Sequence, residues 1–466
     1  MARVFISAAH KSSGKTTLSI GLCAALSARG LDVQPFKKGP DYIDPMWLAQ
    51  ASGNPCYNLD FNTMSADEVL CKVQQQSYLS DITLIEANKG LYDGIALDGS
   101  DSNAALARLT QSPIVLVIDT RGTTRGIAPL LLGYQHFDPT IQIAGVILNR
   151  VGGVRHAAKL REAVEHYTDI KVLGCVQENT ALAIEERHLG LMPSNEQANA
   201  KQHIELLGQV VSEQVDLDQF LHLAQQATPL NALNLSICQP TCRTTPKARI
   251  KLGICQDAAF GFYYPDDLEA LESAGAELVP INTLTDSTLP QIDGLFIGGG
   301  FPETHLAPLA ANQSLQQHIK QAIEAGLPTY AECGGLMYLS RSITWQGQTA
   351  PMVGIIPGDV TLHAKPQGRG IVQFTETEHM PWPALAASFP ATQAAHEFHY
   401  SRLDNLAAQG RFAYRMLRGT GITGDYDGWV YRNLLASYLH RRDTAQYRWA
   451  QRFVDFIRQH QQGLLA

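Results

Sequence analysis

The chain has 466 residues, more than one hydrophobic core usually serves, so two or three domains are expected. Hydrophobic residues make up 45% and charged residues 17%, a balance that is typical of a folded globular protein and excludes a largely disordered one. The formal charge of -8 argues against non-specific binding to nucleic acid or to an anionic membrane, so any anion site has to be local.

The N-terminal residues lead directly into a strand-like segment, without a long apolar stretch or a cleavage pattern, and no window approaches a transmembrane span. We therefore expect a cytoplasmic protein with no membrane partner. The eight cysteines are scattered, and we expect most of them to be reduced structural thiols. Cys238 and Cys242 lie close together but lack a matching second pair for a metal site, so we interpret their segment as a linker.

Two α/β domains are predicted. Residues 1–195 alternate β-branched runs with helical stretches, which is typical of a doubly wound parallel sheet covered on both faces. A helical segment and linker follow at 196–247, and strand-like runs resume in a second α/β domain at 248–466 that closes with a helix near 445–461. The runs of the first domain are 4–8, 33–37, 82–86, 114–119, 143–148 and 172–176, and those of the second include 250–255, 294–297 and 328–331.

A phosphate-binding loop is predicted after the first strand, at Ala9-His-Lys-Ser-Ser-Gly-Lys-Thr-Thr17. Loop amides and the following helix N-terminus attract phosphate oxygens, Lys15 can bridge the outer phosphates, and Thr16 can ligate the magnesium that accompanies ATP. Ala9 replaces the usual first glycine of the loop, so the prediction depends on Gly14, Lys15, Thr16 and their context.

Polar residues follow later strands, and ligands of such sheets bind beyond the carboxyl ends of the strands. Glu86 ends the run 82–86 and can hold magnesium directly or through water. Asp41 and Asp44 follow the second strand, where they can ligate a metal, orient a substrate or simply form turns beside prolines. Asn149 is placed to read an adenine edge.

Cationic side chains are frequent in these loops although the chain is acidic overall. A polyanionic substrate explains the contrast, whereas a solvated surface explains most of the residues individually. They are Lys37, Lys38, Lys89, Arg121, Arg125, Arg150 and Arg187.

A candidate nucleophile, Cys333, lies between a strand and a helical stretch in Pro328-Thr-Tyr-Ala-Glu-Cys-Gly-Gly-Leu336. The upstream segment Gly298-Gly-Gly-Phe-Pro-Glu303 can offer backbone N–H groups to an oxyanion, and His440, after the last apolar run, is the candidate base. A buried core thiol is the alternative for Cys333 alone. The cluster His396-Glu-Phe-His-Tyr-Ser401 is a weak metal site, and we interpret it as lining a site or a domain contact.

Several segments together resemble the cobyrinate a,c-diamide synthase family of cobalamin biosynthesis, and their order spans nearly the whole chain. They are Gly39-Pro-Asp-Tyr-Ile-Asp-Pro45, Glu86 with Gly90-Leu-Tyr-Asp-Gly94, Arg187-His-Leu-Gly-Leu191, Gly298-Gly-Gly-Phe-Pro-Glu303, Ala331-Glu-Cys-Gly-Gly335 and His396-Glu-Phe-His-Tyr-Ser401.

The resemblance implies an N-terminal domain similar to dethiobiotin synthetase and a C-terminal class I-type glutaminase. It implies that ATP phosphorylates the a- and c-side-chain carboxylates of cobyrinate or hydrogenobyrinate, and that ammonia from L-glutamine attacks each acyl phosphate. Cys333 would form the glutamyl thioester with His440 as its base. Class I glutaminases usually carry Glu two residues beyond the His, whereas this chain has Arg442, so we expect a Cys–His dyad unless another residue orients the imidazole.

The remaining assignments combine the residue patterns with this resemblance. Magnesium is the expected cofactor, with ATP as co-substrate, and a homodimer is retained as a hypothesis. The ATP site is assigned to Gly14, Lys15, Thr16, Thr17 and Asn149, the metal to Thr16, Asp41 and Glu86, substrate or phosphate contacts to Asp44, Lys89, Tyr92 and Arg187, and the oxyanion or glutamine site to Gly298, Gly299, Gly300 and Gly334.

Three alternatives stay open. Two are enzymes of the same architecture, cobyric acid synthase and nickel-sirohydrochlorin a,c-diamide synthase, which amidate related positions or rings. The third is a P-loop regulatory ATPase joined to an inactive amidotransferase-like module, and it predicts no hydrolysis of glutamine.

Overall fold

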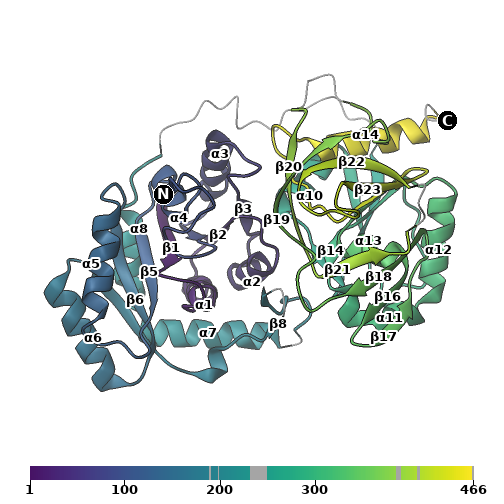
Figure 1. Cartoon of the computed structure of the whole chain (residues 1–466). Helices are drawn as coiled ribbons and strands as arrows, with labels where there is room; N and C mark the ends of the chain where they lie inside the picture. The colour runs from purple at the N-terminus through teal and green to yellow at the C-terminus, as the bar shows by residue number, and fades with distance from the viewer. Residues whose placement is uncertain (188–189, 198, 231–248, 385–389, 407–409, 464–466) are drawn as a thin grey trace. The chain divides into compact units, whose positions relative to one another are not determined.

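The computed structural model describes residues 1–187, 190–197, 199–230, 249–384, 390–406 and 410–463 (Figure 1). The chain divides into two compact units, Met1–Gln239 and Pro240–Ala466, each with its own sheet and core. The predicted helical segment and linker at 196–247 contains the helices Ala200–Gln214 and Leu217–Gln225, while its remainder from 231 on, with Cys238 and Cys242, lies outside the described residues. The domain boundaries at 195 and 248 stay a prediction.

The first unit is built on a seven-stranded sheet whose paired strands are all parallel, in the order β3-β2-β4-β1-β5-β6-β7. All six predicted strand runs are present, and their central strands are almost wholly buried, as expected when helices cover both faces. The strands are Ala2–Ala8 (β1), Val33–Lys38 (β2), Tyr57–Leu59 (β3), Ile82–Glu86 (β4), Ile114–Asp119 (β5), Ile143–Val151 (β6) and Lys171–Gln177 (β7), with a small hairpin of Glu186–Arg187 (β8) and Gly190–Leu191 (β9).

Helices α1 to α6 connect these strands, and η1, α7 and α8 follow β7. Gly21 in α1 and Gly208 in α7 allow close packing, because a Cβ at Gly21 would lie 2.6 Å from Val211 and one at Gly208 would lie 2.9 Å from Ala24. The helices are Lys15–Ala28 (α1), Ile43–Ser52 (α2), Ala66–Ser77 (α3), Asn103–Leu109 (α4), Ile127–Phe137 (α5), Val154–Tyr167 (α6), Thr180–Leu182 (η1), Ala200–Gln214 (α7) and Leu217–Gln225 (α8).

The second unit contains a nine-stranded mixed sheet in the order β12-β10-β13-β15-β24-β23-β22-β19-β20. Strands β12, β10, β13, β15 and β24 pair in parallel, and the remainder are antiparallel. The strands of this sheet are Ile250–Cys255 (β10), Ala276–Ile281 (β12), Gly294–Ile297 (β13), Thr329–Glu332 (β15), Gly368–Glu376 (β19), Gln393–His399 (β20), Arg411–Arg418 (β22), Tyr426–Tyr431 (β23) and Leu434–Ser437 (β24).

Smaller sheets and helices surround this mixed sheet. A four-stranded sheet contains Gln348–Pro351 (β17), Ser340–Trp345 (β16), Ile356–Leu362 (β18) and Ser401–Asp404 (β21), and a two-stranded ladder joins Phe260–Phe262 (β11) to Gly299–Gly300 (β14). The helices are Pro265–Ser273 (α10), Pro302–His305 (η2), Leu306–Ala311 (α11), Gln313–Glu324 (α12), Gly334–Leu339 (α13) and Trp449–Gln461 (α14).

The predicted closing helix is α14, which packs Trp449 and Phe453 against Tyr330 of β15. Large aromatic side chains of this kind bury much apolar surface and fix the helix on the sheet. In the part of the chain that the structure describes, no helix combines the length and apolar character needed to span a bilayer.

Candidate functional site

The phosphate loop connects β1 to α1 as predicted, and its single glycine, Gly14, is structurally required. Gly14 caps α1 with φ 85°, and a Cβ at this position would lie 2.2 Å from Nδ2 of Asn149. That amide nitrogen donates to the carbonyl oxygen of Ser13 at 2.9 Å, so the end of β6 supports the loop from the neighbouring side. Only glycine meets both the left-handed backbone and the close approach.

A buried charge cluster lies beneath this loop and is centred on Glu86 at the end of β4. Oε1 of Glu86 accepts hydrogen bonds from Lys15 Nζ at 2.8 Å and from Thr16 Oγ1 at 2.8 Å. Lys37 Nζ donates to the same oxygen at 2.7 Å and also to Asp44. The structure therefore brings together Lys15, Thr16, Asp44 and Glu86, all predicted site residues, and places Lys37 between the carboxylates of Glu86 and Asp44.

The cluster strongly shifts the pKa values of its members. Burial opposes the charge of Glu86, but Lys15 and Lys37 outweigh it and lower the pKa of Glu86 to about 2. Burial likewise opposes the charge of Lys37, yet Asp44 and Glu86 raise its pKa well above the ordinary value. Burial lowers the pKa of Lys15. Such perturbation is frequent at functional sites.

Asp41 lies at the edge of the same cluster, with Oδ2 3.8 Å from Lys37 Nζ. Its other oxygen accepts the backbone amides of Ile43 at 3.0 Å and Asp44 at 3.1 Å, so it also fixes the turn that starts α2. Burial and the nearby Asp44 raise the pKa of Asp41 to about 6. Two acidic groups held this close favour an added cation.

The cluster has a free position for a magnesium ligand. Oε2 of Glu86 is buried and accepts no hydrogen bond within the described residues. Across those same ranges, no group of three or more His, Cys, Asp and Glu side chains is arranged to hold a metal. One or two carboxylates and a hydroxyl suit Mg²⁺, which keeps several waters and takes its other ligands from substrate phosphates. Glu86, Thr16 and Asp41 fit that description.

Next to the loop is a cavity of about 210 Å³ that includes three of the predicted ATP residues, Gly14, Thr17 and Asn149. Its other walls include segments that the sequence did not single out: Gln177 to Thr180 at the end of β7 and just beyond it, and α7 through Leu207, Val210 and Val211. Among the predicted cations, Arg121 and Arg150 line it too. Hydrogen bonds from Arg121 and Arg150 outweigh burial and lower the pKa of Asp119 to about 2.

The other predicted substrate contacts are dispersed. Lys89 is exposed in the loop after β4. Tyr92 is half-buried, its ring 4.6 Å from that of Phe137, and its hydroxyl donates to the carbonyl of Tyr134. Arg187 lies in β8, paired with Gly190, and its side chain is outside the description. Tyr92 is therefore held by packing, whereas the Lys89 side chain is exposed to solvent.

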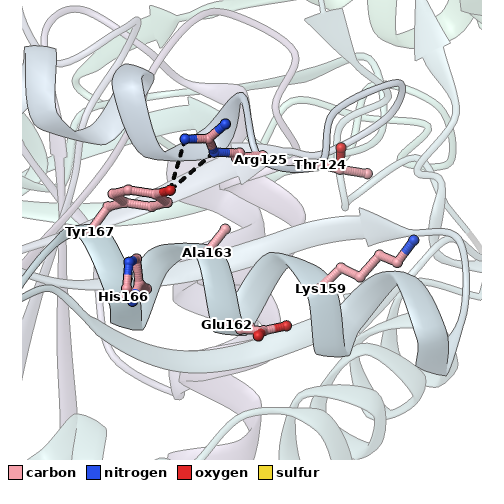
Figure 2. Close-up of a pocket in the computed structure, with 7 residues that line it drawn as sticks. All are labelled: Thr124, Arg125, Lys159, Glu162, Ala163, His166 and Tyr167. Atoms are coloured by element: carbon pink, nitrogen blue, oxygen red, sulfur yellow. Dashed lines mark hydrogen bonds between the residues drawn. The ribbon is translucent and has the colours of Figure 1, made fainter.

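Arg125 contributes to a separate cavity of about 350 Å³ between α6 and the loop that precedes α5 (Figure 2). Its guanidinium donates to the hydroxyl of Tyr167 at 2.8 and 3.1 Å and lies 5.2 Å from that ring. Figure 2 shows Arg125 turned towards Tyr167. The lining includes none of the residues of the phosphate loop, so Arg125 belongs to a different surface.

In the second unit, Cys333 occupies a sharp turn between β15 and α13. Its backbone has φ 46° and ψ −98°, an unusual conformation for a residue other than glycine. Its amide donates to the carbonyl of Ser437 at 2.7 Å, which ties the turn to the end of β24. A strained strand-to-helix turn of this type presents a nucleophile at the edge of a sheet.

The predicted base reaches this turn. His440 follows β24, is 3% exposed, and its imidazole is hydrogen-bonded to the Cys333 thiol. Its Nδ1 lies 3.4 Å from Oε2 of Glu332. Burial opposes protonation of the ring, but the hydrogen bonds with Cys333 and Glu332 raise the pKa of His440 to about 10. The geometry pairs a thiol with an imidazole that favours the charged form.

The His396–Ser401 segment supports this histidine. The backbone groups of His396 and His440 exchange hydrogen bonds of 2.9 and 3.3 Å, and their rings stack at 4.9 Å. Burial and the nearby positive charges of His440 and Arg442 lower the pKa of His396 well below its ordinary value. This position is consistent with the interpretation that the segment lines a site. The neutral ring of His396 packs against the charged ring of His440.

The predicted oxyanion glycines surround the same pair. A Cβ at Gly299 would lie 2.7 Å from Cε1 of His440, and one at Gly334 would lie 2.9 Å from the amide nitrogen of Gly300. Gly298 is different, because its amide donates to the hydroxyl of Tyr263 at 2.9 Å. Gly299, Gly300 and Gly334 are therefore the glycines whose backbone closely approaches the nucleophile and its base.

The fold reveals the contacts of two further residues near the nucleophile. Arg442, at the position where class I glutaminases carry Glu, is buried and forms an ion pair with Asp266 at 2.5 Å. Glu332 immediately precedes the nucleophile and is not among the predicted site residues. The signal in the sequence is a carboxylate at the end of the strand Thr329–Glu332, directly before the candidate nucleophile.

Known proteins match both units. The family model described as "CobQ/CobB/MinD/ParA nucleotide binding domain" matches residues 5–191, and that described as "CobB/CobQ-like glutamine amidotransferase domain" matches residues 251–443. The cobyrinate a,c-diamide synthase of Magnetococcus marinus is 44% identical over 98% of this chain and 97% of its own length. That of Methanosarcina acetivorans is 40% identical over 95% and 93%, and that of Archaeoglobus fulgidus 38% identical over 97% and 96%.

Proposed function

Because the chain belongs to the cobyrinate a,c-diamide synthase family, we propose that its two units divide one amidation reaction between them. The protein is a glutamine-dependent carbon–nitrogen ligase of cobalamin biosynthesis with ATP as co-substrate. Its substrates are the a- and c-side-chain carboxylates of cobyrinate or hydrogenobyrinate, together with L-glutamine. The observation that carries the division is the pairing of Cys333 with His440 in one unit and of the phosphate loop with the Glu86 cluster in the other.

The first unit activates the carboxylate. The loop amides and Lys15 hold the outer phosphates of ATP while a carboxylate oxygen of the ring attacks the γ-phosphorus, which forms an acyl phosphate and releases ADP. Lys37, close to Glu86 and Asp44, adds positive charge beside the transferred group. Magnesium, held by Thr16, Glu86 and Asp41, would neutralise phosphate charge when it is bound.

The second unit supplies ammonia. The Cys333 thiolate attacks the amide carbon of glutamine, and backbone amides near Gly299, Gly300 and Gly334 stabilise the oxyanion. His440, protonated at neutral pH, donates its proton to the departing ammonia, leaving a glutamyl thioester that water hydrolyses to glutamate. Ammonia then attacks the acyl phosphate and expels phosphate, giving the amide.

Product mass tests the substrate assignment. The purified protein with ATP, Mg²⁺ and glutamine should convert cobyrinate or hydrogenobyrinate to a diamide, detected by mass spectrometry. Parallel reactions with nickel-sirohydrochlorin and with the a,c-diamide itself test the two related ligase activities. Amidation of neither cobyrinate nor hydrogenobyrinate, with either glutamine or ammonia as the nitrogen source, would contradict the proposal.

A regulatory ATPase with an inactive amidotransferase-like module is the alternative functional class. It predicts no glutamate release from glutamine, whereas the Cys333–His440 pair predicts hydrolysis. A cytoplasmic location and a homodimer both stay proposals, which localisation of a tagged chain and light scattering of the purified protein would test.

A further inference from the structure

We propose that Glu332 is the positioning residue for His440, so that β15 carries both the nucleophile's turn and the group that orients its base. The proposal rests on the glutaminase function of Cys333 and adds a third member to the expected dyad. Glu332 is a positioning residue because it acts on glutamine through His440.

Hydrogen bonds hold the carboxylate of Glu332 in a position to orient His440. Oε2 of Glu332 lies 3.4 Å from Nδ1 of His440, at the long end of hydrogen-bond distances. The other oxygen, Oε1, accepts the hydroxyl of Tyr330 at 2.6 Å and the backbone amide of Arg441 at 3.1 Å. Glu332 and His440 are each 3% exposed, so water competes little for either group. Both carboxylate oxygens are therefore fixed, one of them towards the imidazole.

The strand arrangement explains how neighbouring residues meet one ring. Strands β15 and β24 run parallel with Glu332 opposite Ser437, which places the residues after β24 beside the end of β15. Successive side chains of a strand point to opposite faces, but the positive φ of Cys333 ends that alternation. Glu332 and Cys333 can then approach the same imidazole from different sides.

The tautomer follows from these contacts. An Nδ1–H that is donated to Glu332 leaves Nε2 as the nitrogen for the thiol, the arrangement that a base requires. The negative charge of Glu332 also stabilises the imidazolium that pairs with a thiolate. A carboxylate that contacts a buried histidine commonly has both effects.

The other charged groups around His440 do not provide this contact. His396 stacks on the ring and is kept neutral by burial, while Arg442 pairs with Asp266. Arg441 donates to Tyr414 at 3.1 Å and to Gln393 at 2.6 Å. Glu332 is the carboxylate that the described residues place against His440.

The test compares glutamine hydrolysis by wild type and Glu332→Gln across pH. We expect kcat/KM for glutamine to fall roughly 10²-fold or more, because the base loses its orientation. Removal of the interaction that raises the pKa of His440 should also move the alkaline limb of the profile to lower pH. Amidation with added ammonia should continue at the wild-type rate.

Glu376→Gln is the matched control. Glu376 is partly buried in the same unit, bonds Arg452 at 2.6 and 2.9 Å and lies 3.7 Å from Arg441, but has no contact with His440 among the described residues. This variant should lower thermal stability and leave the alkaline limb in place. A shift of that limb in the control as large as in Glu332→Gln would overturn the proposal, since any lost carboxylate would then suffice.

Wild-type kcat/KM and an unchanged alkaline limb in folded Glu332→Gln would also overturn the proposal. If Glu332→Gln does not fold, Glu332→Asp carries the test, because it keeps the charge but withdraws it from Nδ1. Its kcat should fall while KM for glutamine stays, and a wild-type kcat would refute the assignment. Failure of the glutaminase function itself is distinguishable, since wild type would then release no glutamate.

Discussion

Glu86→Gln is the substitution that most directly tests the charge cluster under the phosphate loop. Glu86 is fully buried and its Oε1 accepts bonds from Lys15, Lys37 and Thr16 at 2.7 to 2.8 Å. Removal of one partner from a buried ion pair costs roughly 3–5 kcal/mol. The change in the pKa of Glu86 from 4.5 to about 2 corresponds to about 3 kcal/mol, an independent route to a similar magnitude.

We therefore expect the free energy of unfolding of the first unit to fall by about 3 kcal/mol at neutral pH in this variant. Hydrogen exchange of peptides from β1 and β4 measures that unit by itself, which avoids assuming two-state behaviour for a chain with two units. ATP-dependent amidation with ammonia should be lost, while glutamine hydrolysis at Cys333 should remain.

The pH dependence has a definite sign. Because folding lowers the pKa of Glu86, its contribution is present above pH 4.5 and is lost as pH falls towards 2. The difference in stability between wild type and Glu86→Gln should therefore shrink as the solution is acidified through that range.

Glu68→Gln provides the control. Glu68 accepts the Ser65 amide at 2.9 Å in an exposed capping box, an interaction that glutamine can retain, so its cost should stay below about 0.5 kcal/mol. The reasoning is refuted if Glu86→Gln is as stable as Glu68→Gln and still amidates with ATP.

Three further predictions concern the two sites separately. Gly14→Ala should weaken ATP binding, measured by calorimetry, tenfold or more. The left-handed backbone at this position costs a residue with a Cβ about 1–2 kcal/mol, and the new Cβ, 2.2 Å from Asn149 Nδ2, displaces that side chain. An unchanged affinity for ATP would contradict this prediction. Chelation of magnesium should stop ammonia-dependent amidation but not glutamate release, and continued amidation would exclude the proposed metal role. His440→Asn should lower glutamate release at least 10²-fold with little effect on ammonia-dependent amidation, and near-normal release would exclude His440 as the base.

Much of the fold was predictable because its signals are local. The strands of the first unit are continuous apolar runs, and the phosphate loop is recognised by its place between β1 and α1. Strand β3 was missed because three residues, Tyr57–Leu59, at the edge of a sheet give little periodicity. The antiparallel strands β19, β20 and β22 of the second unit are longer, but polar and charged residues interrupt their apolar pattern, so the sequence did not assign them individually.

The chemistry that escaped prediction depends on pairing between distant strands. Lys37 was seen as one of several loop cations, and its contact with Glu86 comes from the β2–β4 register, which sets these two residues opposite each other. Glu332 reaches His440 through the β15–β24 pairing. The Gly298 amide is occupied by Tyr263, which no spacing rule indicates. Residue types identified the candidates, and only the fold assigned them their partners.

The central claim, that Cys333 supplies the ammonia used in the first unit, is tested most directly by Cys333→Ala with each nitrogen source. The sulfur of Cys333 forms the bond to glutamine in the proposed reaction, and the side chain is small. Alanine therefore abolishes thioester formation with little loss of packing. Diamide formation from cobyrinate or hydrogenobyrinate should disappear with glutamine and persist with ammonium at the wild-type rate. Diamide formation from glutamine by Cys333→Ala would contradict the account.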